Sequence, residues 1–476
     1  MIGHAVSADL ALWARLPVAL WNDAAYDTRA IFTGSTTIVN GVPTMVYPGL
    51  CTQHSFPGCT GMVFGIAVPS NHTGDPFLKT WIKPAYNPIL NASGDDPTTA
   101  WRTDSGEWRM TRKDGRVFYS TNFIDWAPAE CAEPSGCGPG GEFFNVSECS
   151  DFFPLPPFCM GVGCAEGGPS PQPNFVHKAS LNGDFYTLGR YEYGPPGSTG
   201  VWTPTHATSS WVPLLQPLDS QVRNDSKPFQ LYTAVGKTFW DPSQNRRVLF
   251  SWVKVLQEGT QSLAREVYYH AQLARLTFAP VPAMSNLREG AALFSQESLN
   301  LPANSTQWLG DWAPGLGNQS EFLATFSLPP SGPGFGFGVV FNAASSDGAV
   351  GNTLRVDYDS NTRRANVSWG GVVRDIDLPL LDGESEIEVH VFLDRSIAEA
   401  YVGPKGQGRL AFTMAAGSSA SAGPAGMALF TEEQAIVIRN VSAWHLKSCW
   451  VTPAEVLAQR DMLRAQARLG LSSQGL

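Results

Sequence analysis

The sequence is poor in charged residues and contains no long apolar run. Charged residues make up 16% of the 476 positions, and 42 acidic residues outnumber 32 basic ones, for a net charge of -10. Binding to a nucleic acid backbone needs clustered Lys and Arg, and the sequence has no basic stripe. No apolar segment reaches the length that spans a bilayer. We therefore expect neither nucleic acid nor membrane insertion among the interactions of this chain.

Long amphipathic helical patterns are also absent from most of the chain. Residues 1–285 consist of short apolar or alternating runs broken by Gly, Pro, Asn and Asp, in keeping with the 47 Gly and 36 Pro of the sequence. Such runs, bounded by turn residues, predict short strands. Repeated groups of short strands favour a β-propeller over a fold of alternating strands and helices. The predicted strands include 38–39 and 42–47 around the turn Asn40-Gly41, and also 106–110, 116–120 and 248–253.

The second part of the chain has a different pattern. Residues 286–300 are predicted to form a linker. From 301 to 448 the strands alternate cleanly, as in residues 386–391, which favours an antiparallel β-sandwich with one buried face on each sheet. In the tail, 449–476, Thr452-Pro453-Ala454-Glu455 is a capping box with Pro at the first helical position, and it predicts a short helix over 456–469, docked or loose.

The eight cysteines and the asparagine sequons favour a secretory route. Three cysteine pairs are close enough in sequence for local disulfides, namely Cys51 with Cys59, Cys131 with Cys137 and Cys159 with Cys164. Cys149 and Cys449 remain, and Cys149 is predicted to be a buried thiol. The cysteine and histidine spacings lack a matching second half for zinc, so we expect no metal and no cofactor. Sequons lie at Asn71, Asn91, Asn145, Asn224, Asn304, Asn318, Asn366 and Asn440.

The first residues do not resemble a signal peptide. Met1-Ile2-Gly3-His4 supplies neither a charged region nor an apolar one. The sequons and cysteines nevertheless predict a secreted or vacuolar glycoprotein. We therefore expect that an N-terminal segment is missing from this chain.

The run Ser-Glu-Cys-Ser-Asp-Phe-Phe-Pro at residues 147–154 resembles the glutamate-cysteine box of family 32 of the glycoside hydrolases, the invertases and fructan hydrolases. Similarity to that family extends over residues 1 to about 448. The resemblance implies a five-bladed β-propeller at 1–285, with an incomplete first blade, followed by a β-sandwich at 301–448. The other segments that carry it are 3–13, 32–36, 95–101, 237–242 and 394–397 with Glu399.

The resemblance assigns roles to several residues. It makes Glu148 the general acid/base and Asp96 the group that stabilises the oxocarbenium-like transition state, and it places Phe32 and Ser35 at the sugar pocket. Asp95 occupies the position of an arginine in the family's Arg-Asp-Pro box, so a positive charge is replaced by a negative one beside the substrate. A retaining glycosidase uses two carboxyl groups about 5–5.5 Å apart.

The attacking carboxylate of that family lies in a Trp-x-Asn-Asp-Pro-Asn-Gly box, which does not occur in these 476 residues. Trp21-Asn22-Asp23 is superficially similar, but its neighbours match a later, non-catalytic segment, so Asp23 is not predicted to be the nucleophile. Because Asn145 lies three residues before Glu148, its sequon is predicted to carry no glycan.

Three functions remain open from the sequence. The first is hydrolysis of terminal β-fructofuranosides, such as sucrose or fructans. The second is a non-catalytic relative that binds the same sugars, which the Asp95 replacement favours. The third is transfer of the fructosyl group to another sugar. In each case the expected partner is a small carbohydrate.

Overall fold

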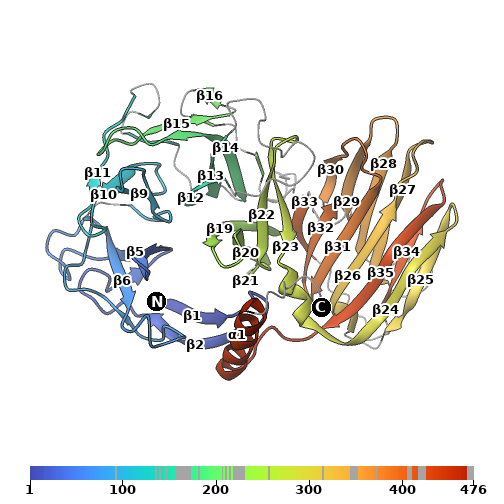
Figure 1. Cartoon of the computed structure of the whole chain (residues 1–476), viewed down its shortest axis with the longest axis horizontal. Coiled ribbons are helices and arrows are strands. Elements are labelled where there is room, and N and C mark those ends of the chain that lie inside the picture. Colours follow the sequence, from blue (N-terminus) through green and yellow to red (C-terminus); the bar gives the residue numbers. More distant parts are fainter. Residues whose placement is uncertain are drawn as a thin grey trace.

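The computed structural model describes most of the chain as β-strands arranged in a ring and an adjoining sandwich (Figure 1). The described part comprises residues 1–91, 94–133, 137–138, 141–144, 148–155, 173–180, 183–205, 207–209, 212–213, 216–217, 231–255, 258–312, 316–343, 352–370, 373–404, 410–415 and 425–468. The predicted pair Cys159 and Cys164 and the sequon asparagine Asn145 lie outside these residues.

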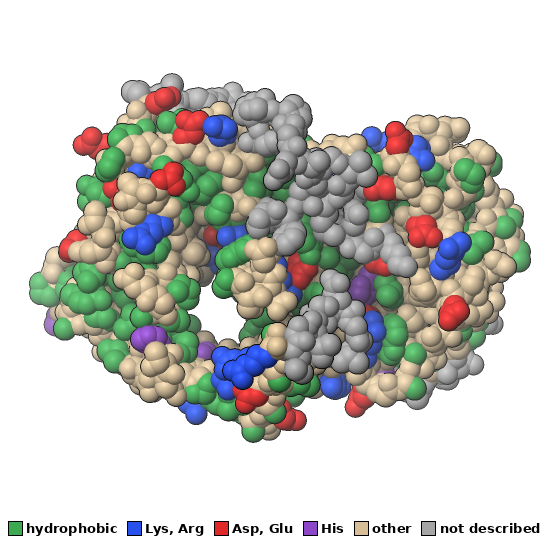
Figure 2. All heavy atoms as spheres, in the orientation of Figure 1, with side chains coloured by type: hydrophobic (Ala, Val, Ile, Leu, Met, Phe, Trp, Pro, Cys, Tyr) green, Lys and Arg blue, Asp and Glu red, His purple; other side chains and the backbone are tan. Residues whose placement is uncertain are grey.

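The ring consists of antiparallel sheets that surround a central opening, which Figure 2 shows as a hollow through the molecule. Two hydrogen-bonded strands form the first sheet among the described residues, and the larger sheets have four or five. The sheets are β1 (Ile2–Ser7) and β2 (Trp13–Leu20); β3 (Ala30–Ile31), β4 (Ser35–Val39), β5 (Val42–Leu50), β6 (Met62–Pro69) and β7 (Trp81–Ile82); β8 (Trp101–Arg102), β9 (Trp108–Thr111), β10 (Val117–Ser120) and β11 (Ala127–Pro128); β12 (Glu148–Pro154), β13 (Phe175–Ser180), β14 (Asp184–Glu192), β15 (Val201–Pro204) and β18 (Gln216–Pro217); β16 (Ala207–Ser209) and β17 (Val212–Pro213); and β19 (Leu231–Asp241), β20 (Arg246–Val255), β21 (Glu258–Gln261), β22 (Arg265–His270) and β23 (Arg275–Pro280).

The sandwich consists of two six-stranded antiparallel sheets that bury one large apolar core between them. Alternation of buried and part-exposed residues along its strands gives each sheet one face toward this core. The strands are β24 (Arg288–Leu301), β35 (Ile436–Leu446), β26 (Gln319–Ser327), β31 (Glu386–Asp394), β32 (Ile397–Gly403) and β33 (Leu410–Ala415) in one sheet, and β25 (Ser305–Trp312), β34 (Ala425–Thr431), β27 (Phe335–Ala343), β28 (Asn352–Asp359), β29 (Arg364–Trp369) and β30 (Val373–Pro379) in the other. Two short 3-10 helices, η2 (Pro282–Leu287) and η3 (Leu316–Asn318), lie between strands.

The predicted strands are confirmed, but the predicted linker is wrong. Asn40 and Gly41, with φ of 50° and 83°, form the two-residue turn between β4 and β5. Residues 286–300, in contrast, contain most of β24, a 14-residue strand that pairs with β35. Because β24 is at the edge of its sheet and most of its side chains are exposed or half-exposed, it lacks the alternation that marks a strand in the sequence.

The tail is docked on the first sheet. The Trp13 amide donates to the Cys449 carbonyl at 2.7 Å, and the Val451 amide donates to the Trp13 carbonyl at 2.9 Å, so the segment before the helix runs beside β2. The helix α1 (Pro453–Arg468) follows, with the Thr452–Glu455 capping box formed as predicted. Gln459 donates to Asp9 at 2.5 Å. No helix that the structure describes is long and apolar enough to span a membrane.

Two of the predicted disulfides are present, and Cys149 is a buried free thiol as predicted. Cys51 bonds to Cys59, and Cys131 bonds to Cys137. Both bonds close short loops, with sequence separations of 8 and 6.

Candidate active site

Glu148 is the first residue of β12, the end strand of its sheet, which faces the middle of the ring in Figure 1. Its side chain is exposed, whereas the next five residues of the strand are buried. Cys149 has φ of 45°, and the pairing with β13 shifts register between Glu148 and Asp151. Such a bulge bends the strand end and redirects its side chains. The apolar residues therefore anchor β12 while Glu148 stays free of the core.

Asp96 lies directly beside this strand end. Its Oδ2 accepts a hydrogen bond from the Cys149 amide at 2.8 Å, and the residue is only 7% exposed. Like Cys149, Asp96 has a positive φ, 52°. The fold thus brings together the two residues that the resemblance assigned to one site, although 52 positions separate them in the sequence.

Two buried lysines support the backbone of this box, and sequence reasoning assigned a role to neither. Lys237 donates to the Ser150 carbonyl at 2.7 Å and to the Pro97 carbonyl at 3.2 Å. It therefore joins the strand of Glu148 to the loop of Asp96. Burial lowers the pKa of Lys237. Lys178 donates to the Cys149 carbonyl at 3.1 Å and forms an ion pair with Asp184 at 2.8 Å.

The predicted pocket residues Phe32 and Ser35 lie on the segment between β3 and the start of β4. The Ser35 hydroxyl donates to the Pro97 carbonyl at 2.7 Å, so it holds the Asp96 loop. Thr33 is a hydrogen-bond partner of the Cys149 thiol, whose pKa burial raises to about 11. Phe32 is 41% exposed. This segment therefore contacts both the Asp96 loop and the glutamate-cysteine box.

Asp95 and Asp23 are both engaged by lysines. The Lys113 ammonium lies 2.7 Å from Asp95 Oδ1 and 2.9 Å from Oδ2. Lys113 was missed by sequence reasoning, because nothing in the turn that carries it indicates a site. Asp23 is 71% exposed and pairs with Lys83 at 2.8 Å, and Lys83 also pairs with the buried Asp27. These contacts give Asp23 a partner in an exposed ion pair. That Asp23 is not the nucleophile stays a prediction.

His177 is a buried histidine beneath the box, on β13. Its ring stacks on Phe144 with the centroids 3.5 Å apart, and neither ring nitrogen has a hydrogen-bond partner among the described residues. Burial, assisted by the charge of Lys178, lowers the pKa of His177 to about 3. The imidazole is therefore neutral in the folded protein over most of the acid range.

We expect acid to destabilise the protein through His177, and His177→Phe to relieve the effect. The unfolded chain takes up a proton below its ordinary pKa of 6.5, whereas the folded chain does so only near pH 3. The free energy of unfolding therefore decreases as the pH falls from 6.5 toward 3. For His177 alone, this decrease amounts to about 2 kcal/mol at pH 5. Urea unfolding at pH 7 and pH 5 measures it. The variant should lose less stability between the two values than the wild type; an equal loss would contradict the assignment. His72→Gln, which alters an exposed histidine, is the control.

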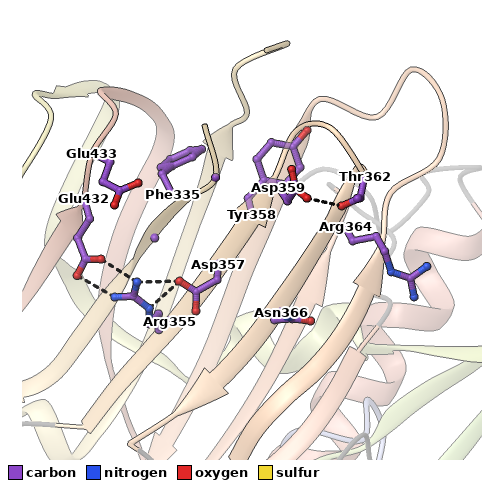
Figure 3. A pocket seen from close by; sticks show the side chains of 12 residues that line it. Phe335, Arg355, Asp357, Tyr358, Asp359, Thr362, Arg364, Asn366, Glu432 and Glu433 are labelled. Atoms are coloured by element: carbon purple, nitrogen blue, oxygen red, sulfur yellow. Dashed lines mark hydrogen bonds and ion pairs between the residues drawn. The ribbon is translucent and has the colours of Figure 1, made fainter. Parts of the chain in front are cut away.

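A separate hollow of about 430 Å³ lies on the outer sheet of the sandwich (Figure 3). Its central Arg355 pairs with Glu432 and Asp357, each at 2.7 Å. Tyr358 and Phe335 form part of its wall, and the sequon residue Asn366 lies on its rim strand. The charged groups at its centre are thus matched with one another. It shares no residue with the Glu148 site.

A ring of β-sheets joined to a β-sandwich, with Asp96 bonded to the strand end that carries Glu148, defines a two-domain β-propeller protein with a candidate carboxylate site. The model of the glycosyl hydrolases family 32 N-terminal domain matches residues 2–277. The chain therefore belongs to glycosyl hydrolase family 32, and the resemblance read from the sequence is confirmed.

Relatives of known type are similar over much of the chain. Beta-fructofuranosidase 1 of Zea mays is 30% identical over 399 residues, which cover 74% of this chain and 54% of the relative. The vacuolar acid beta-fructofuranosidase 2 of a Rosa hybrid cultivar is 32% identical over 272 residues, covering 53% of this chain and 38% of the relative. The chain spans about half the length of the curated relatives it matches.

Among solved structures, fructan 1-exohydrolase IIa from Cichorium intybus superposes with a TM-score of 0.71. The match covers 94% of this chain and 90% of that one, at 23% identity. At this identity the likeness establishes the fold, a β-propeller followed by a β-sandwich.

Proposed function

We propose that this chain acts on terminal β-fructofuranosides such as sucrose or fructans, and that hydrolysis proceeds by the retaining two-carboxylate mechanism. The observation that carries the proposal is the hydrogen bond from the Cys149 amide to Asp96, which sets the Asp96 carboxylate next to Glu148. In this proposal Glu148 protonates the leaving oxygen and then activates water. Asp96, oriented by its hydrogen bond from the Cys149 amide, stabilises positive charge on the fructosyl ring.

The mechanism also needs a carboxylate that attacks the anomeric carbon. The 476 residues contain no Trp-x-Asn-Asp-Pro-Asn-Gly sequence, and Asp23 is engaged by Lys83. We therefore assign to this chain the acid/base and the stabilising roles only. Hydrolysis is proposed for this chain joined to a segment that carries such a box, which we call the extended protein.

Non-catalytic binding of the same sugars is the second candidate. The absent box and the acidic Asp95 favour it, because both weaken catalysis more than recognition. A fructosyltransferase has the same two roles for Glu148 and Asp96 and differs only in the acceptor.

The two candidates are separated by measuring binding and turnover side by side. We expect calorimetry to give saturable heat with sucrose or inulin, because the sugar hydroxyls meet the charged oxygens of the site, and none with maltose, which contains no fructose. The extended protein should also release fructose. Binding heat without fructose release would favour the non-catalytic sugar-binding function. If neither heat nor fructose release is detected, action on fructosides is refuted.

The proposed location is the secretory route or the vacuole. The two disulfides support it, since such bonds persist in oxidising compartments. The vacuolar relative from rose is consistent with it.

A further inference from the structure

Lys113 is anchored to the loop that carries Asp96 by backbone and side chain together. It lies in the turn between β9 and β10. The Lys113 amide donates to the Asp95 carbonyl at 3.2 Å, and its ammonium is 2.7 Å from Asp95 Oδ1. Both ends of one residue therefore fix Asp95, and with it the neighbouring carboxylate of Asp96.

The ammonium group of Lys113 also interacts electrostatically with Asp96 and Glu148. The pKa of Lys113 is raised above its ordinary value, first by the hydrogen bond to Asp95 and then by the charges of Asp95, Asp96 and Glu148. Its side chain is 33% exposed, so these interactions are only partly screened by solvent. Lys113 is thus a cation that interacts with all three acidic groups of the site.

The other charged groups around the site are committed to different partners. On the turn of Lys113, Arg112 donates to Asp114 at 2.7 Å. Beneath the box, Lys178 is matched with Asp184, and Lys237 donates to backbone carbonyls. Among the residues that the structure describes, Asp151 on β12 accepts hydrogen bonds from Thr238, and Arg247 on β20 donates to Thr238.

We propose that Lys113 is a positioning residue of the active site: through its ion pair with Asp95 it fixes the Asp96 loop and sets the charge that surrounds Glu148. The proposal rests on the function proposed above for Glu148 and Asp96. Asp95 puts a negative charge beside the substrate, and Lys113 offsets it from the neighbouring turn. The site then keeps a cation without an arginine at position 95.

A defined effect on the pH dependence follows. A cation near the acid/base group favours loss of its proton, and an anion favours retention. Lys113→Met should therefore move the alkaline limb of the pH–rate profile to higher pH, and Asp95→Asn should move it to lower pH. Lys113→Arg, which keeps the charge, should leave the limb in place. A role confined to folding would lower the rate at every pH without moving the limb.

The electrostatic link can also be measured without turnover. Acetic anhydride acylates only unprotonated amines, so trace labelling at pH 9, followed by peptide mass spectrometry, reports the fraction of free Lys113 amine. The exposed Lys79 is the internal reference. Removal of a nearby anion should raise the labelling of Lys113, by about 2-fold in Glu148→Gln and up to about 10-fold in Asp95→Asn. Glu192→Gln should not change it.

The two measurements separate this inference from the proposed function. If Glu148→Gln leaves the labelling of Lys113 unchanged, the link between Lys113 and the site is refuted whether or not fructosides are hydrolysed. If labelling responds but the alkaline limb of an active enzyme stays fixed, the catalytic meaning is refuted. If labelling responds and the wild type hydrolyses no fructoside, the charge assignment holds and the function proposed for Glu148 fails.

Discussion

Replacing Glu148 with glutamine is expected to lower sucrose hydrolysis by the extended protein by about 10²- to 10⁴-fold. The amide has the shape of the carboxyl group but cannot deliver a proton to the departing sugar oxygen. The buried run that follows Glu148 and the bulge at Cys149 should keep the side chain in place, so the loss is chemical. Initial rates of fructose release give kcat and KM for both proteins, and the decrease should lie in kcat.

The leaving group provides an internal check on this interpretation. A fructoside with a nitrophenol leaving group needs little protonation, so its first step, measured as the initial release of nitrophenol, should suffer much less from Glu148→Gln than the first step with sucrose does. Glu192→Gln, at an exposed glutamate that pairs with Arg190, is the matched control and should keep wild-type rates. Wild-type turnover of sucrose in Glu148→Gln would remove Glu148 from the mechanism.

Replacing Glu399 with alanine is expected to cost about 3–5 kcal/mol of folding free energy, because it leaves a buried charge without its partner. Glu399 lies on β32 of the sandwich and is 6% exposed. It accepts hydrogen bonds from the Leu263 amide at 2.7 Å and from Arg265 Nη2 at 2.8 Å. Arg265 lies on β22, the last part of the ring, and also donates to Thr413 at 2.6 Å. The pair therefore joins the two domains.

Urea unfolding at neutral pH measures this cost. Glu432→Ala is the control, since Glu432 pairs with Arg355 but is 47% exposed, and such surface pairs contribute about 0–1 kcal/mol. Glu399→Gln should fall between the two because it keeps one hydrogen-bond acceptor. If Glu399→Ala is no more destabilising than Glu432→Ala, the contact between the domains does not depend on this pair.

Local patterns in the sequence predicted local structure well. The turn Asn40-Gly41, the alternation in residues 386–391 and the capping box at Thr452 are each confirmed, because each depends on neighbours a few positions away. The family motifs predicted the propeller and the sandwich, which the structure and the comparisons confirm. The roles assigned to Glu148 and Asp96 stay predictions, although the fold brings the two residues together.

The supporting groups of the site could not be predicted in this way. Lys237 contacts Ser150 from 87 positions away and Pro97 from 140 positions away, so no local pattern indicates the contact. Lys113 stands in an ordinary polar turn, and only the folded chain brings it to Asp95. The edge strand β24 was mistaken for a linker because its solvent-facing residues conceal the pairing with β35.

The buried thiol of Cys149 offers a way to measure local opening of the candidate site. It is 3% exposed and is held largely in its unreactive protonated form, while its amide holds Asp96. Because the Cys149 amide bonds to Asp96, we expect an alkylating reagent to reach this sulfur when the end of β12 separates from the Asp96 loop. The rate of alkylation at Cys149, resolved from that at Cys449 by peptide mass spectrometry, thus measures how often Glu148 and Asp96 separate, with no substrate present and no engineered label.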